Sequence, residues 1–270
     1  MEQNANHPTD DAPLPSGPPP APRRNVKLVI AYNGAAYHGW QRQAAGMDTV
    51  QERIEQALIR VIRHPVVVFG ASRTDAGVHA AGQVANFYTA NFSIPMAGLR
   101  QALNSRLPRD IAVLSAQVVG DDFHASRSAV GKTYRYRIHT APVRPVELAG
   151  LVYHYWRLLE VEPMQEAAAR LVGTHDFRGL TTSLEKRQAT VRTIHSCQVC
   201  RLDQEIHVTV QGDGFLYNMV RNIVGTLMEI GRGHWGPDQI DKILASRNRA
   251  DAGPTAPPDG LCLVCVHYEE

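Results

Sequence analysis

The order of strand-like and helix-like segments is the feature of this sequence that most restricts how the chain can fold. The helix expected over residues 49–63 carries Val50, Ile54 and Leu58 at every fourth position, which places them on one apolar face. Strand-like runs surround it, so the first half has the order β-α-β-β-α-β, over residues 26–32, 49–63, 66–72, 83–89, 95–107 and 111–119. This order is typical of a ferredoxin-like unit of the α+β class.

The rest of the chain repeats a similar pattern at greater length. A strand, a helix, a hairpin, two further helices and a last strand are expected over residues 132–140, 163–173, 195–203, 205–212, 217–231, 237–247 and 260–268. Gly231 and Gly233 suit a helix end, and Pro237 suits the first turn of the next helix. We therefore predict an α+β fold of two related halves, over residues 26–122 and 123–270.

Residues 1–25 are expected to form a separate tail. The first 24 residues hold seven of the seventeen prolines and almost no large apolar side chain. A segment of this composition cannot bury enough apolar surface to fold, so we predict disorder. It has no apolar stretch after a basic start, and no run in the chain approaches the ~18 apolar residues of a membrane span. We therefore expect a cytoplasmic protein with no membrane partner.

Charge and cysteine content exclude little by themselves. The formal net charge is only +2, so a nucleic-acid surface would have to come from local clustering. Two C-x-x-C pairs, Cys197/Cys200 and Cys262/Cys265, raise the possibility of zinc. Both pairs lie in strand-like runs, where residues three apart point to opposite faces and cannot bind one metal. We therefore predict reduced cysteines and no metal.

The segment GASRTDAGVHAAGQVANF, residues 70–87, is the first candidate functional site. Two strand-like runs flank a loop of small residues that holds Arg73, Asp75 and His79. Functional loops are often placed on rigid strands in this way. The alternative is an ordinary hairpin in which Asp75 caps a turn. His79 is either a proton shuttle or the partner in a structural hydrogen bond.

Arg221 is the second candidate. In the helix expected over 217–231 it lies at the edge of an apolar stripe. A guanidinium held there needs a carboxylate partner, because an unpaired buried charge is costly. The alternative is that the side chain extends to water.

The third candidate is the strand GKTYRYRIHT. Residues 123–137 carry Arg127, Lys132, Arg135 and Arg137 and no acid, a local charge of +4. Tyr134 shares a strand face with Lys132, so aromatic and basic side chains are interleaved. Such interleaving suits base stacking combined with phosphate contacts. The alternative is a solvated edge strand.

Taken together, these segments resemble the tRNA pseudouridine synthase A family. The resemblance runs from about Val26 to the end, through AYNGAAYHGWQRQ, SRTDAGVHAAGQV, DDFHASRSA with KTYRY, MVRNIVGTLMEIG and GLCLV in that order. It implies a pseudouridine synthase fold, with two ferredoxin-like halves whose antiparallel sheets join across a central cleft. It also implies a homodimer that needs no metal or organic cofactor and acts on uridines 38, 39 and 40 in the anticodon stem-loop of tRNA.

The resemblance also implies roles for particular residues. Asp75 matches the catalytic carboxylate, which acts on the sugar, and Arg221 matches the arginine that pairs with it. Tyr134 matches the tyrosine that packs on the uracil and is a candidate base at C5. Arg73 matches an arginine that holds the RNA while the uridine is flipped out. Apart from the resemblance, the basic strand described above leads us to expect that Lys132 contacts the substrate.

The last strand is expected to provide apolar contacts to the base through Leu261 and Leu263. Cys262 departs from the family, which often has an aromatic there, and Gly179 with Leu180 replaces part of a D-F-x-S-F pattern. Both departures bear on RNA contacts. Three alternatives stay open: an RNA-binding module without activity, an enzyme of this fold acting on another RNA, and a zinc protein.

Overall fold

The computed structural model describes residues 22–44, 46–182 and 189–269 of the 270-residue chain. Most of the predicted tail, residues 1–21, lies outside the described residues. The first strand begins at Arg24, two residues earlier than the sequence suggested. Asn25, which the sequence placed in the tail, is buried and its amide donates to the carbonyls of Gly120 and Phe123. This side chain ties the first strand to residues 120–123 and so belongs to the fold.

The first half contains the predicted β-α-β-β-α-β order. Its elements are β1 (Arg24–Tyr32), α1 (Val50–Ile62), β2 (Phe69–Gly70), β3 (His79–Thr89), α2 (Met96–Asn104) and β4 (Ile111–Val119). Only the second strand differs much from the prediction, because the run 66–72 forms just two strand residues. Residues 71–72 lead into the loop of Asp75, although the Ala71 amide still donates to the Val84 carbonyl of the next strand.

The second half repeats the order with insertions. Its main elements are β5 (Ala129–His139), β6 (Tyr153–His154), α3 (Val161–Ala169), β7 (Gly173–Asp176), β8 (Val191–Leu202), β9 (Glu205–Gly212), α4 (Met219–Gly231), α5 (Gln239–Ser246) and β10 (Leu261–Tyr268). β8 and β9 form the expected hairpin. Gly233 has φ of 77° just beyond α4, as a residue that ends a helix often does.

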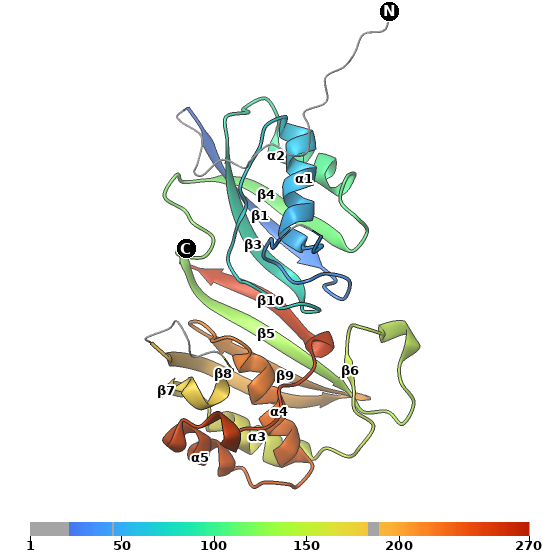
Figure 1. Cartoon of the computed structure of the whole chain (residues 1–270), viewed down its shortest axis with the longest axis vertical. Helices are drawn as coiled ribbons and strands as arrows, with labels where there is room; N and C mark the ends of the chain where they lie inside the picture. The colour runs from blue at the N-terminus through green and yellow to red at the C-terminus, as the bar shows by residue number, and fades with distance from the viewer. Residues whose placement is uncertain (1–21, 45, 183–188, 270) are drawn as a thin grey trace, which may run out of the picture.

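The strands of the described residues join in a single sheet, shown in Figure 1. Its main path is β4-β1-β3-β10-β5-β9-β8-β7. The first half has the strand order β4-β1-β3-β2, and the second half has the equivalent order β10-β5-β9-β8. Each half is therefore a ferredoxin-like unit. The halves meet where β10 pairs in parallel with β3, with Cys262 opposite His79 and Leu263 opposite Ala80. The predicted α+β class is confirmed.

The core lies between the sheet and the helices that cover one face of it. α1 and α2 cover the first half in Figure 1, and α3 and α4 cover the second. Leu28 of β1 and Ile54 of α1 are fully buried in the first half, as are Val208 and Leu227 in the second. Burial of each such side chain contributes about 1.5–3 kcal/mol. The central strands β10 and β5, between the two helix pairs, are the part of this face where a cavity opens.

The expectation that the two cysteines of each C-x-x-C pair point to opposite faces is correct for one pair and wrong for the other. Cys197 is buried and Cys200 is exposed, as alternation along β8 requires. Cys262 and Cys265 instead pair with Arg135 and Thr133, which lie two residues apart and share a face. A bulge between Leu263 and Cys265 adds one residue and turns the second cysteine to the same side as the first.

Two further properties follow from the part of the chain that the structure describes. Within it, no group of three or more His, Cys, Asp or Glu side chains is arranged to hold a metal ion. No helix there has the length and apolar character needed to cross a membrane.

Candidate active site

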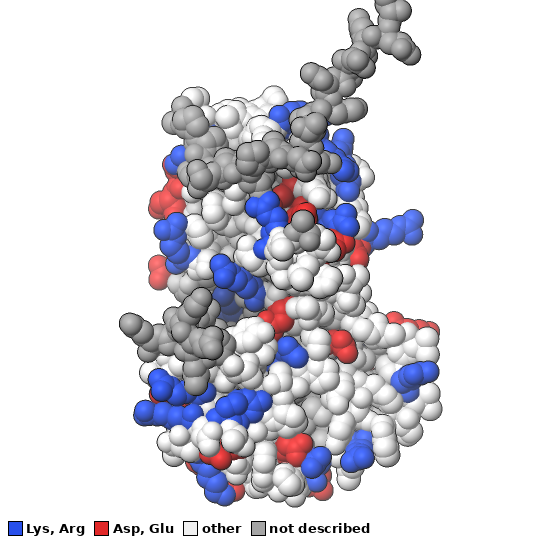
Figure 2. All heavy atoms as spheres, in the orientation of Figure 1, with Lys and Arg blue, Asp and Glu red and all other residues white. Residues whose placement is uncertain are grey.

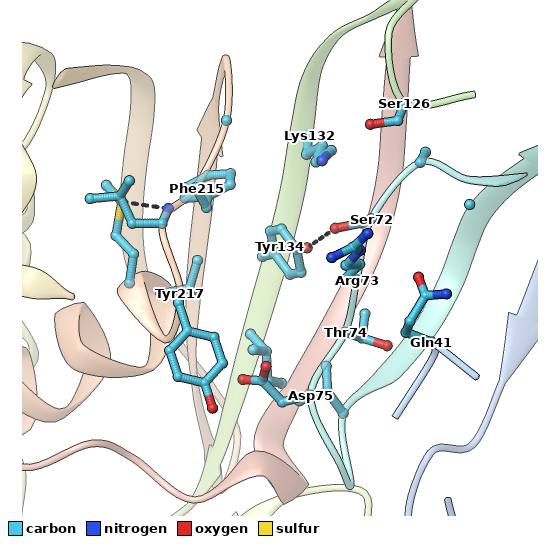
Figure 3. Close-up of a pocket in the computed structure, with 18 of the residues that line it drawn as sticks. Gln41, Ser72, Arg73, Thr74, Asp75, Ser126, Lys132, Tyr134, Phe215 and Tyr217 are labelled. Atoms are coloured by element: carbon cyan, nitrogen blue, oxygen red, sulfur yellow. Dashed lines mark hydrogen bonds between the residues drawn. The ribbon is translucent and has the colours of Figure 1, made fainter. Parts of the chain in front are cut away.

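A cavity of about 1110 Å³ opens between the two halves, and Figure 3 shows its interior. The loop around Asp75 forms one wall, and the start of α4 with the turn before it forms the other. Tyr134 of β5 and Leu261 of β10 form the floor. Three segments that the sequence singled out separately therefore meet here, since Asp75, Tyr134 and Arg221 all line the same space.

The loop that carries Asp75 is held on several sides. The Tyr32 and Thr74 hydroxyls are hydrogen-bonded at 2.8 Å, and the Trp40 amide donates to the Thr74 carbonyl at 3.1 Å. Gly34 lets the neighbouring loop approach, because a Cβ there would lie 2.0 Å from the Val78 carbonyl oxygen. The carboxylate is thus presented from a backbone with little freedom, which suits a catalytic group.

His79 serves this loop as a structural link. Its Nδ1 accepts from the Gly34 amide at 3.0 Å, so its Nε2 carries the proton and donates to the Asp259 carbonyl at 3.1 Å. Burial lowers the pKa of the imidazole, which favours this neutral form. The His79 imidazole thus links three segments, which are the loop after β1, the loop of Asp75 and the turn before β10. The structural role, rather than proton shuttling, accounts for these contacts.

Arg221 and Asp75 approach each other across the cavity. Arg221 Nη1 lies 3.3 Å from Asp75 Oδ2, and the two side chains are 16% and 25% exposed. Nε of the same guanidinium donates to the Ala256 carbonyl at 2.7 Å, and the Ala256 amide donates back to the Arg221 carbonyl. Arg221 is therefore oriented from behind by the segment that precedes β10.

Burial and charge act in opposite directions on Asp75. Burial raises the pKa of its carboxyl, while the positive charge and the hydrogen bond of Arg221 lower it. The net direction is upward. Without Arg221, the ionised form would therefore be disfavoured further.

α4 is positioned by close backbone packing. A Cβ on Gly225 would lie 1.7 Å from the Pro254 carbonyl oxygen, so only glycine lets the helix touch the segment before β10. Asn218, just before the helix, has φ of 57° and accepts a hydrogen bond from Arg221 Nη1 at 3.2 Å. These contacts place the arginine at the end of α4 that faces the cavity.

Tyr134 lies on the floor of the cavity with a fixed hydroxyl. Its oxygen is 2.6 Å from Ser72 Oγ, and its ring meets Phe215 edge to face at 5.3 Å. Burial raises the pKa of the phenol to about 12, so it is protonated at neutral pH. The ring is 7% exposed, which leaves one surface toward the cavity.

The other predicted residues differ in position. Arg73 is exposed and lines the cavity beside Ser72, while Lys132 lines it from β5. Leu261 lines the floor, whereas Leu263 is fully buried and packs in the core instead. Alternation along β10 would have allowed both leucines to reach the cavity, but core side chains enclose Leu263.

Several lining residues were missed from the sequence. Gln41, Gln51, Arg192, Phe215 and Tyr217 all reach the cavity. Phe215 and Tyr217 come just before the Arg221 helix, and their closeness to Arg221 in sequence was a usable signal. Arg192 starts a strand far along the chain from the other residues, and no local pattern marks it.

The cavity has the electrostatics of a nucleic-acid site. In the space-filling view, basic side chains gather around the hollow between the halves (Figure 2). Among the described residues, one carboxylate, Asp75, lines it together with four basic residues, which are Arg73, Lys132, Arg192 and Arg221. A net positive lining attracts a polyanion such as RNA.

Comparisons with known proteins agree with this geometry. A family model described as tRNA pseudouridine synthase matches residues 28–126 and 167–269. The chain is 48% identical over 245 residues to tRNA pseudouridine synthase A of Acetivibrio thermocellus, covering 91% of this chain and 100% of that protein. It is 43% identical over 245 residues to tRNA pseudouridine synthase A 2 of Clostridium perfringens, with the same coverage.

A third relative and one solved structure are also similar. tRNA pseudouridine synthase A of Syntrophotalea carbinolica is 44% identical over 243 residues, covering 90% of this chain and 96% of that protein. A chain from the crystal structure of a Cbf5-Nop10-Gar1 complex shows a distant likeness, with a TM-score of 0.34 and 11% identity. It covers 75% of this chain and 44% of that chain.

Proposed function

This chain belongs to the tRNA pseudouridine synthase family, and on that basis we propose that it converts uridines 38, 39 and 40 in the anticodon stem-loop of tRNA to pseudouridine. The enzyme is an isomerase that acts on tRNA. The choice of the three positions rests on the family resemblance of the sequence motifs. The observation that best supports the proposal is the Asp75 carboxylate, paired with Arg221 in a cavity with a basic lining.

Asp75 acts at the sugar of a uridine that has left the base stack. The reaction breaks the bond between N1 and C1′, rotates the uracil and joins C5 to C1′, so no atoms are gained or lost overall. An ionised Asp75 serves either as the nucleophile at C1′ or as the base that removes a proton from C2′ to give a glycal. Both routes use a carboxylate close to a developing positive charge, as glycoside chemistry does.

Arg221 keeps this carboxylate ionised and aimed. Its charge opposes the effect of burial on the pKa of Asp75, so a larger fraction of the enzyme is active at neutral pH. Because the Ala256 carbonyl holds Nε, the guanidinium cannot swing away from Asp75 freely. Arg221 is therefore the partner of the reacting group.

Tyr134 and Leu261 hold the detached uracil. Both lie on the floor of the cavity with little exposed surface, which excludes water from the base while its bond to the sugar is broken. For Tyr134 to remove the C5 proton, its own hydroxyl proton must leave, and Ser72 Oγ is the neighbouring oxygen at 2.6 Å. Packing on the base does not need that step.

The basic residues at the rim bind the RNA. Arg73 is exposed beside the loop of Asp75, where it holds the backbone while the uridine is flipped. Lys132 and Arg192 lie on the opposite wall and floor and contact phosphates. Flipping costs a few kcal/mol, and such contacts offset part of this cost.

The same family resemblance leads us to propose a cytoplasmic homodimer built from halves over 26–122 and 123–270. Four large apolar side chains between β5 and α3 are more than 60% exposed, namely Val143, Val146, Trp156 and Leu158. Burial against a second copy would remove this surface from water. Light scattering of the purified protein tests the dimer, and a monomer at micromolar concentration would contradict it.

The experiment that tests the function uses unmodified tRNA and maps pseudouridine after incubation with the purified protein. We expect pseudouridine at positions 38, 39 or 40 with the wild type and none with Asp75→Asn. Binding without product from the wild type would favour the RNA-binding module without activity. Product at other positions, or only in another RNA, would favour the enzyme with a different substrate.

A further inference from the structure

Tyr217 is a large aromatic residue that stands exposed at the rim of the cavity. Its side chain is 51% exposed, although the residues on either side of it in the chain are mostly covered. Figure 3 shows the ring on the wall opposite the loop of Asp75, with the hydroxyl turned toward the carboxylate side. The ring faces open space within the cavity and has no aromatic neighbour among the described residues.

The backbone beneath this ring is fixed. Thr181 Oγ1 donates to the Tyr217 carbonyl at 2.9 Å, and the preceding Leu216 is 5% exposed. The following residue, Asn218, has left-handed backbone geometry and is hydrogen-bonded to Arg221. A ring presented from a fixed backbone loses little freedom when a second ring stacks on it. The ring of Tyr217 is thus preorganised to stack on a planar group.

Exposure distinguishes Tyr217 from the two residues assigned to the reacting base. Tyr134 and Leu261, which are 7% and 5% exposed, leave the inner space for the target uracil. Tyr217 is 51% exposed, so its ring is open to solvent, where the chain of a bound RNA continues on either side of the flipped nucleotide. A ring that stacks on Tyr217 therefore belongs to a neighbouring nucleotide.

We propose that Tyr217 stacks on the base of a nucleotide directly adjacent to the target uridine; this rests on the proposed function. Aromatic side chains next to basic residues are the usual way to bind single-stranded nucleic acid, since the bases stack and the phosphates pair. Arg192 on the same side of the cavity is available for the phosphates.

The proposal also accounts for a requirement of the reaction. An enzyme that modifies three successive positions meets different neighbouring bases at each of them. Stacking accepts any base, because each has an aromatic face, whereas hydrogen bonds to base edges would select one sequence. Tyr217 holds the neighbour without reading its identity.

The test is a double-mutant cycle between Tyr217 and the neighbouring base. Unmodified tRNA is prepared with an abasic residue on the 5′ or the 3′ side of the uridine that the wild type modifies. Dissociation constants and saturated single-turnover rates are measured for the wild type, Tyr217→Leu and Tyr217→Phe. Phe92→Leu is the matched control, because Phe92 is 54% exposed and does not line the cavity.

We expect Tyr217→Leu to weaken the binding of normal tRNA by about tenfold or more, the range of one lost base–aromatic stack. Tyr217→Phe should bind within about twofold of the wild type, because the ring is kept. With the abasic residue on one side, the wild type should lose the same factor and Tyr217→Leu should lose nothing further.

Three results overturn the proposal. The first is unchanged tRNA binding by Tyr217→Leu, and the second is a loss of binding by Tyr217→Phe as large as that by Tyr217→Leu. The third is that the effects of Tyr217→Leu and of the abasic residue add up, both when that residue is on the 5′ side and when it is on the 3′ side. An active wild type with any of these results rejects the stacking role alone. A wild type that makes no pseudouridine rejects the proposed function instead, and with it the role of Tyr217 beside a target uridine.

Discussion

Replacement of Arg221 by methionine tests the ion pair at the centre of the site. Methionine keeps much of the apolar stem and removes the charge, so α4 should still pack. Two unit charges 3.3 Å apart interact by about 5 kcal/mol at an effective dielectric constant of about 20. Because both side chains are partly exposed, solvent screening should leave about half of this, ~2.7 kcal/mol. If all of this energy is lost from the ionised, reacting form of Asp75, the rate falls by up to about a hundredfold.

The pH dependence identifies the cause of this loss. Burial already raises the pKa of Asp75, and Arg221 works against that rise. Without Arg221 the pKa moves further upward, so a smaller fraction of Asp75 is ionised at neutral pH. Activity of Arg221→Met should therefore recover as the pH increases. Arg221→Lys should recover part of the rate at neutral pH, because a point charge replaces the planar group only in part.

The assay is a single-turnover measurement at saturating tRNA across pH and salt. Arg192→Met is the matched control, since Arg192 lines the same cavity and hydrogen-bonds to its own segment of the chain. It should weaken tRNA binding in a salt-dependent way and leave the pH profile unchanged. A near-normal saturated rate for Arg221→Met, with only salt-sensitive affinity lost, would refute the ion pair and assign Arg221 to a phosphate.

Three further predictions concern stability and the tail. Gly225→Ala should lower the thermal midpoint, at a cost of about 1–3 kcal/mol or more, because the added Cβ would meet the Pro254 carbonyl. The control Gly98→Ala in α2 should be neutral or stabilising. Equal midpoints for the two variants would contradict the close packing at Gly225. The pKa of His79 is depressed in the folded state, so the neutral imidazole stabilises the fold fully at a pH above the ordinary imidazole pKa, and this stabilisation is lost as the pH falls below that value. The thermal midpoint of His79→Gln should therefore depend less on acid pH than that of the wild type. Parallel pH profiles for the two proteins would contradict this. Deletion of residues 1–21, whose composition suits no core, should leave the midpoint and the activity unchanged, and a large loss of either would show that the tail docks.

The sequence was sufficient for the order of elements and for the residue types of the site. Apolar periodicity marked α1 and α4 because their buried faces repeat along the chain with the period of the helix. It also required a partner for Arg221, since a charge at the edge of an apolar stripe is costly when unpaired. Asp75 and Tyr134 were identified differently, from local residue patterns read together with the family motifs.

Tertiary structure alone decided how these pieces meet. Asp75 and Arg221 are 146 residues apart, and their contact depends on the parallel pairing of β10 with β3, which no local pattern encodes. The bulge in β10 placed Cys262 and Cys265 on one face, although strict alternation predicted opposite faces. Leu263 was covered and Tyr217 left exposed for the same physical reason: burial depends on which segments pack against a residue, and those segments come from distant parts of the chain.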